Sequence, residues 1–180
     1  MSAPLVSVIV PSYNQGQYIG ATLDSIFEQD YRPLEVLVID GASSDGTVEV
    51  LRRYNVHPEL QWWSEPDRGV TDAVNKGLAR AKGEILAVQS SDDLYSPGAI
   101  SAAVAALESD PTLGLVYGDA EYIDAESRSV GGTSLPPFNL VEYVGKRTFV
   151  PQPAAFFTRA AAATGGAWRA EVSYAADAEF

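Results

Sequence analysis

The chain of 180 residues contains no cysteine and only one histidine. The absence of cysteine excludes disulfide bonds, thiolate chemistry and Cys-ligated metal sites, and it fits a reducing compartment. Basic side chains are also few, with 12 Lys and Arg against 24 Asp and Glu, which gives a formal net charge of −12. Because a nucleic-acid backbone is bound by clusters of Lys and Arg, we expect no nucleic-acid partner.

Long apolar runs are missing as well, since no run approaches the roughly 18 residues of a membrane span. The first residues, Met1-Ser2-Ala3-Pro4, lack the basic and apolar regions of a signal peptide. We therefore expect a cytoplasmic protein, with peripheral association at the inner face of a membrane left open. With 46% hydrophobic residues, the chain is expected to fold as one domain over residues 1–180.

Short β-branched runs alternate with helical periods over the first 119 residues. Strands are predicted at 6–10, 35–39, 60–63, 85–88 and 113–117, and helices at 19–27, 47–54, 70–81 and from Ser96-Pro97 onward. This alternation implies parallel βαβ units in a three-layer sandwich. Residues 120–150 are expected to form loops and edge strands, and 152–158 to return to the sheet.

Adjacent carboxylates at Asp92 and Asp93 follow the apolar run 84–88 through a short polar step. Like charges this close raise each other's pKa unless a cation or fixed donors offset them. Asp40 and Asp119 follow two other predicted strands in the same way. Because loops after the carboxyl ends of the strands line one crevice in an open α/β sheet, we expect these acids to converge there. The pattern indicates a metal-assisted site for a phosphorylated ligand.

Other metal-binding and phosphate-binding patterns do not fit. The turn at 40–47 lacks the ligands of a calcium loop, because Arg52 would take the twelfth position. The chain has neither G-x-x-x-x-G-K-S/T nor a G-x-G-x-x-G after its first strand. Taken alone, the turn is also consistent with Ser44 or Asp45 capping the next helix, but capping does not account for the acids after the other strands.

Six motifs occur in a fixed order along the chain. They are Val8-Ile9-Val10-Pro11-Ser12-Tyr13-Asn14, Ile39-Asp40-Gly41-Ala42-Ser43-Ser44-Asp45-Gly46-Thr47, Ser64-Glu65-Pro66-Asp67-Arg68-Gly69, Asp72-Ala73-Val74-Asn75-Lys76-Gly77, Ser91-Asp92-Asp93 and Tyr117-Gly118-Asp119. Together they resemble the family-2 nucleotide-diphosphosugar glycosyltransferases of the GT-A fold. The resemblance implies a Rossmann-like α/β/α sandwich with a mixed, mostly parallel central sheet. Residues 1–119 would bind the nucleotide sugar, and residues 120–180 would form the acceptor side.

The resemblance also implies roles for individual residues. Pro11 and Tyr13 would form the base-binding wall, and Asp40 would hydrogen-bond the nucleobase or ribose. Asp92 would lie on the ribose or sugar side, and Asp93 would ligate Mn²⁺ or Mg²⁺ bridging the donor diphosphate. Further substrate-binding candidates are Asn14, Asp67, Arg68, Asp72, Asn75 and Gln152. The structural alternatives are an ordinary strand-end aromatic for Tyr13 and a local ion pair for Asp67-Arg68.

The last residues resemble the start of the family's acidic helix motif, in which the carboxylate at Asp177 is the general base. A sugar hydroxyl needs such a carboxylate within hydrogen-bond reach to lose its proton during attack, and Glu179 is the second candidate. Because Asp177 lies close to Phe180, we expect the acceptor side to be truncated here. These 180 residues are expected to bind a nucleoside diphosphate with Mn²⁺ but to transfer sugar poorly.

The predicted function is an inverting glycosyltransferase that uses a nucleoside-diphosphate sugar, by default a UDP-sugar. The acceptor would be a hydroxyl of a glycan or lipid-linked molecule in bacterial cell-surface polysaccharide or glycan biosynthesis. Two other classes keep the same architecture. A sugar-nucleotide pyrophosphorylase calls for a Gly-rich first turn with Arg and Lys, which is absent after Val10. A non-catalytic nucleotide-sugar-binding protein would have lost the base or the metal ligand, but Asp93 and Asp177 are both present.

Overall fold

The computed structural model describes residues 3–169 of the chain, and its centre is a six-stranded mixed sheet. The strands are β1 (Val6–Ser12), β2 (Leu34–Asp40), β3 (Leu60–Ser64), β4 (Ile85–Val88), β5 (Leu115–Tyr117) and β8 (Ala155–Thr158). Their order is β3-β2-β1-β4-β8-β5. The first four are parallel, whereas β8 is antiparallel to both β4 and β5. The expected mixed, mostly parallel sheet is confirmed.

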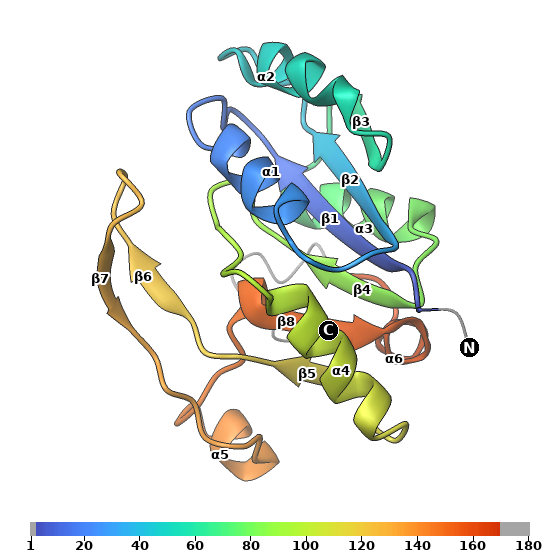
Figure 1. The fold of residues 1–180 in the computed structure, drawn as a ribbon, viewed down its shortest axis with the longest axis vertical. Coiled ribbons are helices and arrows are strands. Elements are labelled where there is room, and N and C mark those ends of the chain that lie inside the picture. The colour runs from blue at the N-terminus through green and yellow to red at the C-terminus, as the bar shows by residue number, and fades with distance from the viewer. Residues whose placement is uncertain (1–2, 170–180) are drawn as a thin grey trace.

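Helices cover both faces of this sheet (Figure 1). One face carries α1 (Ile19–Phe27), α2 (Thr47–Arg53) with the 3₁₀ helix η1 (Tyr54–Val56), and α4 (Ala99–Ser109). The other face carries α3 (Val70–Arg80) and α6 (Arg159–Gly165). Alternate residues of β1 supply the two cores, with Val8 and Val10 in the first and Ile9 in the second. The three-layer α/β/α sandwich is therefore confirmed.

The innermost strands are buried along their whole length. Every residue of β1, β2 and β4 is buried, which explains why these strands appear in the sequence as nearly continuous apolar runs. Their parallel pairing places Ser12 beside Asp40, and Ile9 beside Val88. The loops that leave the carboxyl ends of these strands consequently emerge at one edge of the sheet.

Two element boundaries differ from the sequence-based expectation. Helix α4 begins at Ala99, so Pro97 lies before the helix and not in its first turn. Gly98 has a φ of 77°, a left-handed conformation that the helix cannot include. Residues 152–154 form the 3₁₀ helix η2 (Gln152–Ala154), and the return strand β8 therefore starts only at Ala155.

Residues 120–150 form the expected excursion from the sheet. A hairpin of β6 (Glu121–Ile123) and β7 (Ser129–Gly132) extends away from the main body, followed by the short helix α5 (Leu140–Val144) (Figure 1). Asn139 caps α5 by accepting hydrogen bonds from the backbone amides of Val141 and Glu142. Within residues 3–169, no helix is long and apolar enough to cross a membrane.

Helix α3 packs closely on β1 because Gly77 has no side chain. A Cβ atom at Gly77 would lie 2.3 Å from Cγ2 of Ile9, which is itself fully buried. The glycine therefore sets how near the helix comes to the sheet. The first turn of this helix contributes to the site described below, so its distance from β1 also bears on that site.

Replacing Gly77 by alanine sets two effects against each other. Helix propensity favours alanine by ~1 kcal/mol, whereas forcing a methyl group into Ile9 costs ~1–3 kcal/mol or more. We expect packing to prevail, so that Gly77→Ala lowers the free energy of unfolding in urea titrations. The matched control is Gly20→Ala in α1, where an added methyl group meets nothing closer than 3.6 Å and stability should not fall. A stabilised Gly77→Ala variant would contradict the packing explanation.

Candidate functional site

A cavity of about 530 Å³ lies at the edge where the parallel strands end. Pro11 and Tyr13 line it at the end of β1, and Asp92 lines it after β4. The loop before α3 contributes Asp67. These four residues were all predicted from the sequence as substrate-binding, and the fold brings them to one cavity.

The two loops after β1 and β2 are joined by hydrogen bonds. The backbone amide of Asn14 donates to Oγ of Ser43 at 2.7 Å, and the amide of Ser44 donates to Oδ1 of Asn14 at 3.0 Å. A third hydrogen bond joins the same two loops, since the backbone amide of Gly16 donates to Oδ2 of Asp45 at 2.9 Å. Asn14 thus links the loops and does not line the cavity, while the neighbouring Tyr13 is 63% exposed at the cavity wall.

Asp40 lies beneath these loops with its side chain fully buried. Its Oδ2 accepts hydrogen bonds from the amide of Ser43 at 3.0 Å and from Oγ of Ser64 at 2.6 Å, and its Oδ1 accepts a short one from Oγ of Ser43. Buried carboxylates need such donors, because an unpaired buried charge costs several kcal/mol. Asp40 therefore anchors the loop after β2 to the end of β3, and its predicted contact with a base or ribose stays a prediction.

Gly41 separates Tyr13 from Asp67 in the cavity. A Cβ atom at this position would lie 2.8 Å from Oδ2 of Asp67 and 3.2 Å from Cδ2 of Tyr13. The other carboxylate oxygen of Asp67 accepts a hydrogen bond from the amide of Gly69 at 2.8 Å, which holds the side chain in place. The absence of a side chain at Gly41 therefore keeps the space between the aromatic ring and the carboxylate open.

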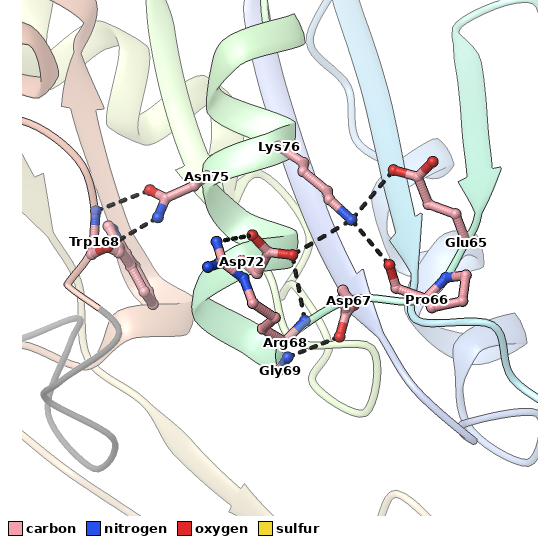
Figure 2. Close-up of polar contacts among 9 residues, drawn as sticks. All are labelled: Glu65, Pro66, Asp67, Arg68, Gly69, Asp72, Asn75, Lys76 and Trp168. Atoms are coloured by element: carbon pink, nitrogen blue, oxygen red, sulfur yellow. Dashed lines mark hydrogen bonds and ion pairs between the residues drawn. The ribbon is translucent and has the colours of Figure 1, made fainter.

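Ion pairs surround the start of α3 (Figure 2). The Asp72 carboxylate contacts Nη2 of Arg68 at 3.1 Å and Nζ of Lys76 at 3.4 Å, and Lys76 also reaches Glu65 at 3.2 Å. The hydrogen bond from Arg68 lowers the pKa of Asp72. Arg68 thus pairs with Asp72. The alternative interpretation of the sequence had paired Arg68 with its neighbour Asp67. These contacts tie the loop before α3 to the helix.

Asp92 and Asp93 differ in their surroundings. Asp92 is exposed and lines the cavity, whereas Asp93 is partly buried and is not among the lining residues. Burial raises the pKa of the Asp93 carboxyl, the charge of Asp92 raises it further, and a hydrogen bond with Ser90 opposes both effects. A cation beside this pair would relieve the repulsion.

The donor set around this pair fits a shared cation. Residues 3–169 hold no cluster of three or more acidic or histidine side chains suited to a metal. Mg²⁺ is usually bound by one or two carboxylates together with phosphate oxygens of a substrate, so an all-protein cluster is not required. Asp93, with Asp92 beside it, therefore fits a cation shared with a phosphorylated ligand.

Two predicted residues bind the backbone of distant segments. Nε2 of Gln152 donates to the carbonyl of Val88, and its Oε1 accepts from Oγ of Ser90 at 3.3 Å. Asn75 makes two hydrogen bonds with the backbone of Trp168 (Figure 2). Gln152 thus braces the segment that leads to Asp92, and Asn75 lies on a side of α3 that does not line the cavity.

Asp119 does not line the cavity with Asp92, although the sequence placed both after strands. Strand β8 is inserted between β4 and β5, so the carboxyl end of β5 lies two strands from that of β4. Asp119 is exposed there and accepts a hydrogen bond from the amide of Leu135 at 2.8 Å. Asp177 lies outside the described residues.

Several residues of the cavity wall were missed from the sequence. They are Ser12, Gln15, Gly41, Pro66, Gly69, Val70, Ala73, Ser90 and Ser91. A signal existed for Ser90 and Ser91, which form the polar step before Asp92. Val70 gave no such signal, because its apolar side chain fits the helical period of 70–81, yet it is 57% exposed in the first turn of α3. Small residues such as Ala73 and Gly69 give no chemical signal in the sequence, because they line the cavity without a functional group and leave its space open.

A protein family and several known proteins are similar to this chain in sequence. The model of the family described as "Glycosyl transferase family 2" matches residues 7–163. An uncharacterized glycosyltransferase of Mycobacterium tuberculosis is 35% identical over 183 residues, which cover 99% of this chain and 68% of that protein. The chondroitin synthase of Pasteurella multocida is 31% identical over 138 residues, which cover 76% of this chain and 14% of that protein.

Solved structures show the same fold. A mannosyltransferase from Pyrobaculum calidifontis, in complex with GDP-Man and Mn²⁺, superposes with a TM-score of 0.71 at 32% identity and covers 94% of this chain. TarS of Staphylococcus aureus superposes with a TM-score of 0.74 at 22% identity and covers 96% of this chain. The match spans 48% of the first structure and 52% of the second, so the chain spans about half the length of these structures. The chain therefore belongs to glycosyl transferase family 2 and has the GT-A fold.

Proposed function

We propose that the protein is an inverting, metal-assisted glycosyltransferase that uses a nucleoside-diphosphate sugar. The observation that carries the proposal is that Asp92 lines the same cavity as Pro11 and Tyr13, with Asp93 following directly. An aromatic wall on one side suits a nucleobase, and paired carboxylates on the other suit a cation that neutralises a diphosphate. A single ligand that needs both surfaces is a nucleoside diphosphate.

Tyr13 and Asp67 are the residues best placed to hold the base. The exposed ring of Tyr13 offers a flat apolar face for stacking, and Asp67 presents a carboxylate oxygen across the gap at Gly41. A carboxylate accepts hydrogen bonds from the N–H groups of uracil or guanine. UDP is our default nucleotide, and the mannosyltransferase bound to GDP-Man and Mn²⁺ supports GDP as the first alternative to test.

Asp93 would hold Mn²⁺ or Mg²⁺ together with the diphosphate of the donor. The ion would act as a Lewis acid and offset the negative charge that develops on the leaving diphosphate. Asp92, exposed beside it, would orient the ribose or the sugar. Gln152 would keep this segment in place through its contacts with Val88 and Ser90.

We propose Asp177 as the general base, although it lies outside the described residues. The acceptor hydroxyl would give its proton to this carboxylate as its oxygen forms a bond to the anomeric carbon, while the bond from that carbon to the diphosphate oxygen breaks. One displacement inverts the anomeric configuration. Similarity to the Pasteurella multocida chondroitin synthase supports a glycan as the acceptor, in cell-surface polysaccharide or glycan biosynthesis.

Nucleoside diphosphate binding should depend on a divalent ion, because Asp92 and Asp93 would otherwise repel the diphosphate. We expect Asp93→Ala to weaken UDP binding in the presence of Mn²⁺ by at least tenfold, about 1.4 kcal/mol, in calorimetric titrations. The matched control is Asp110→Ala, which removes an exposed carboxylate that accepts hydrogen bonds from Thr112 in a distant loop. Equal affinity with Mn²⁺ and with a chelator, for UDP and GDP alike, would contradict the metal bridge.

Gly41→Ala should narrow the space between Tyr13 and Asp67. The added methyl group would displace one of these side chains, and we expect nucleotide affinity to fall at least about tenfold while the melting temperature changes little. The same titration on Gly20→Ala, at a residue that does not line the cavity, should match the wild type. Unchanged affinity in Gly41→Ala would place the base elsewhere.

Asp177→Asn should abolish the basicity of this residue while keeping its size. In the full-length protein, kcat should fall roughly 10²-fold or more with little change in donor affinity. Release of nucleoside diphosphate from a panel of UDP- and GDP-sugars would measure the rate, with Asp110→Asn as the control. Turnover near the wild-type rate would assign the role to Glu179 or to another carboxylate.

A further inference from the structure

Gln29 lies just after the end of α1, and its side chain is hydrogen-bonded at both ends although the residue is only 5% exposed. Its Nε2 donates to the carbonyl of Ser25 at 3.1 Å and to the carbonyl of Ser96 at 3.0 Å. Its Oε1 accepts from the amide of Ile100 at 3.2 Å. Buried polar groups need such partners, and two of these three partners belong to the segment that follows Asp93.

The contact with Ile100 completes the start of α4. The first amides of a helix have no acceptor within the helix, and the residue before the helix usually supplies one from its side chain. Gly98 holds that place in α4 and makes no side-chain cap. Because Ile100 is fully buried, its amide needs an acceptor from the protein. Gln29 therefore caps α4 from a distant part of the chain.

Ser25, in the last turn of α1, makes a second attachment to the same segment. Its Oγ accepts from the amide of Tyr95 at 3.1 Å and donates to the carbonyl of Thr22 at 2.8 Å. The ring of Tyr95 is buried and stacks on Phe156 of β8, with ring centroids 5.5 Å apart. Residues 95–100 are thus fixed to the end of α1 and to β8.

The acidic pair lies on a short span between this attachment and Gln152. Asp93 precedes Tyr95 by two residues, which span at most about 7 Å of extended chain. On the other side, Gln152 contacts the carbonyl of Val88 and Oγ of Ser90. The amide of Asp93 donates to the carbonyl of Ser90 at 3.1 Å, which closes a tight turn. The span that carries both carboxylates is therefore held at its two ends.

We propose that Gln29 is a positioning residue for the divalent ion, because it holds the segment after Asp92 and Asp93 in place. The inference rests on the proposed function, since it takes this pair to bind a cation shared with the nucleoside diphosphate. Mg²⁺ requires near-ideal octahedral geometry with oxygens at about 2.0–2.1 Å, so a small shift of a carboxylate weakens its binding. Gln29 does not line the cavity, and it acts through the segment without contacting the donor.

A positioning role differs measurably from simple support of the fold. The cavity residues Tyr13 and Asp67 lie on loops that Gln29 does not contact through its side chain. Loss of Gln29 should therefore weaken the contribution of the metal and not the binding of the base. The Mn²⁺ concentration that gives half of the nucleotide binding reports this contribution directly. A purely structural role would lower stability and leave that concentration unchanged.

The experiment is a double-mutant cycle in the full-length protein with Gln29→Met and Asp93→Ala. Methionine is chosen because it keeps a long unbranched side chain in the core while removing both polar ends. Calorimetry uses UDP or GDP, whichever binds more tightly, over a series of Mn²⁺ concentrations. We expect Gln29→Met to raise the half-saturating Mn²⁺ concentration at least about fivefold. Because Gln29 acts through the acidic pair, the double variant should bind within about twofold of Asp93→Ala alone.

Three further variants separate positioning from general damage. Ser25→Ala removes only the acceptor for the Tyr95 amide, and it should raise the half-saturating Mn²⁺ concentration at least about twofold. Leu107→Ala destabilises α4 from a buried position seven residues beyond Ile100, or about 10 Å along the helix, and should leave that concentration unchanged. Gln61→Met, at an exposed residue of β3 that does not line the cavity, should match the wild type.

The outcomes distinguish the positioning role from the proposed function. If Asp93→Ala weakens binding while Gln29→Met has the Mn²⁺ dependence of the wild type, the positioning role is wrong and the metal bridge stands. If the two effects multiply, or if Leu107→Ala changes the Mn²⁺ dependence equally, Gln29 supports the fold only. If Asp93→Ala binds like the wild type, the metal bridge fails and the positioning role fails with it. If Gln29→Met does not fold, Ser25→Ala replaces it in the cycle under the same criteria.

Discussion

The buried carboxylate of Asp40 is the constraint on which the cavity wall at Tyr13 depends. A charge removed from water must be met by donors, and here Ser43 and Ser64 supply them. Ser43 in turn accepts a hydrogen bond from the amide of Asn14, the residue after Tyr13. A chain of polar contacts therefore leads from the centre of the sheet to the exposed ring of Tyr13. The aromatic wall is held by buried electrostatics and not by packing of the ring itself.

The parallel and antiparallel parts of the sheet contribute differently to the cavity. The parallel strands β1, β2, β3 and β4 bring four loops to one edge and so create the cavity. The antiparallel strand β8 returns the chain beside β4, and Gln152, just before it, contacts the segment leading to Asp92. Helix α3 connects the cavity with a second distant segment, because it lines the cavity at Val70 and Ala73 and binds the backbone of Trp168 through Asn75. Residues far apart in the sequence thus meet around the acidic pair.

Much of the fold was predictable because it depends on local periodicity. Apolar runs such as the one ending at Val88 identified the strands, and the adjacency of Asp92 and Asp93 identified the acidic wall. The displacement of Asp119 was not predictable, because the insertion of β8 between β4 and β5 leaves no trace in strand spacing. The same holds for the pairing of Asn75 with Trp168, since a hydrogen bond across 93 residues follows from tertiary packing and not from any repeat in the chain.

The hydrogen bonds between the loops after β1 and β2 bear on how this edge of the cavity can be altered in the laboratory. Asn14 and Gly16 on one loop are matched to Ser43, Ser44 and Asp45 on the other. Substituting or lengthening either loop alone would leave backbone amides without acceptors at the cavity rim. The two loops therefore form one structural unit, and a transplant between family members should carry both loops together.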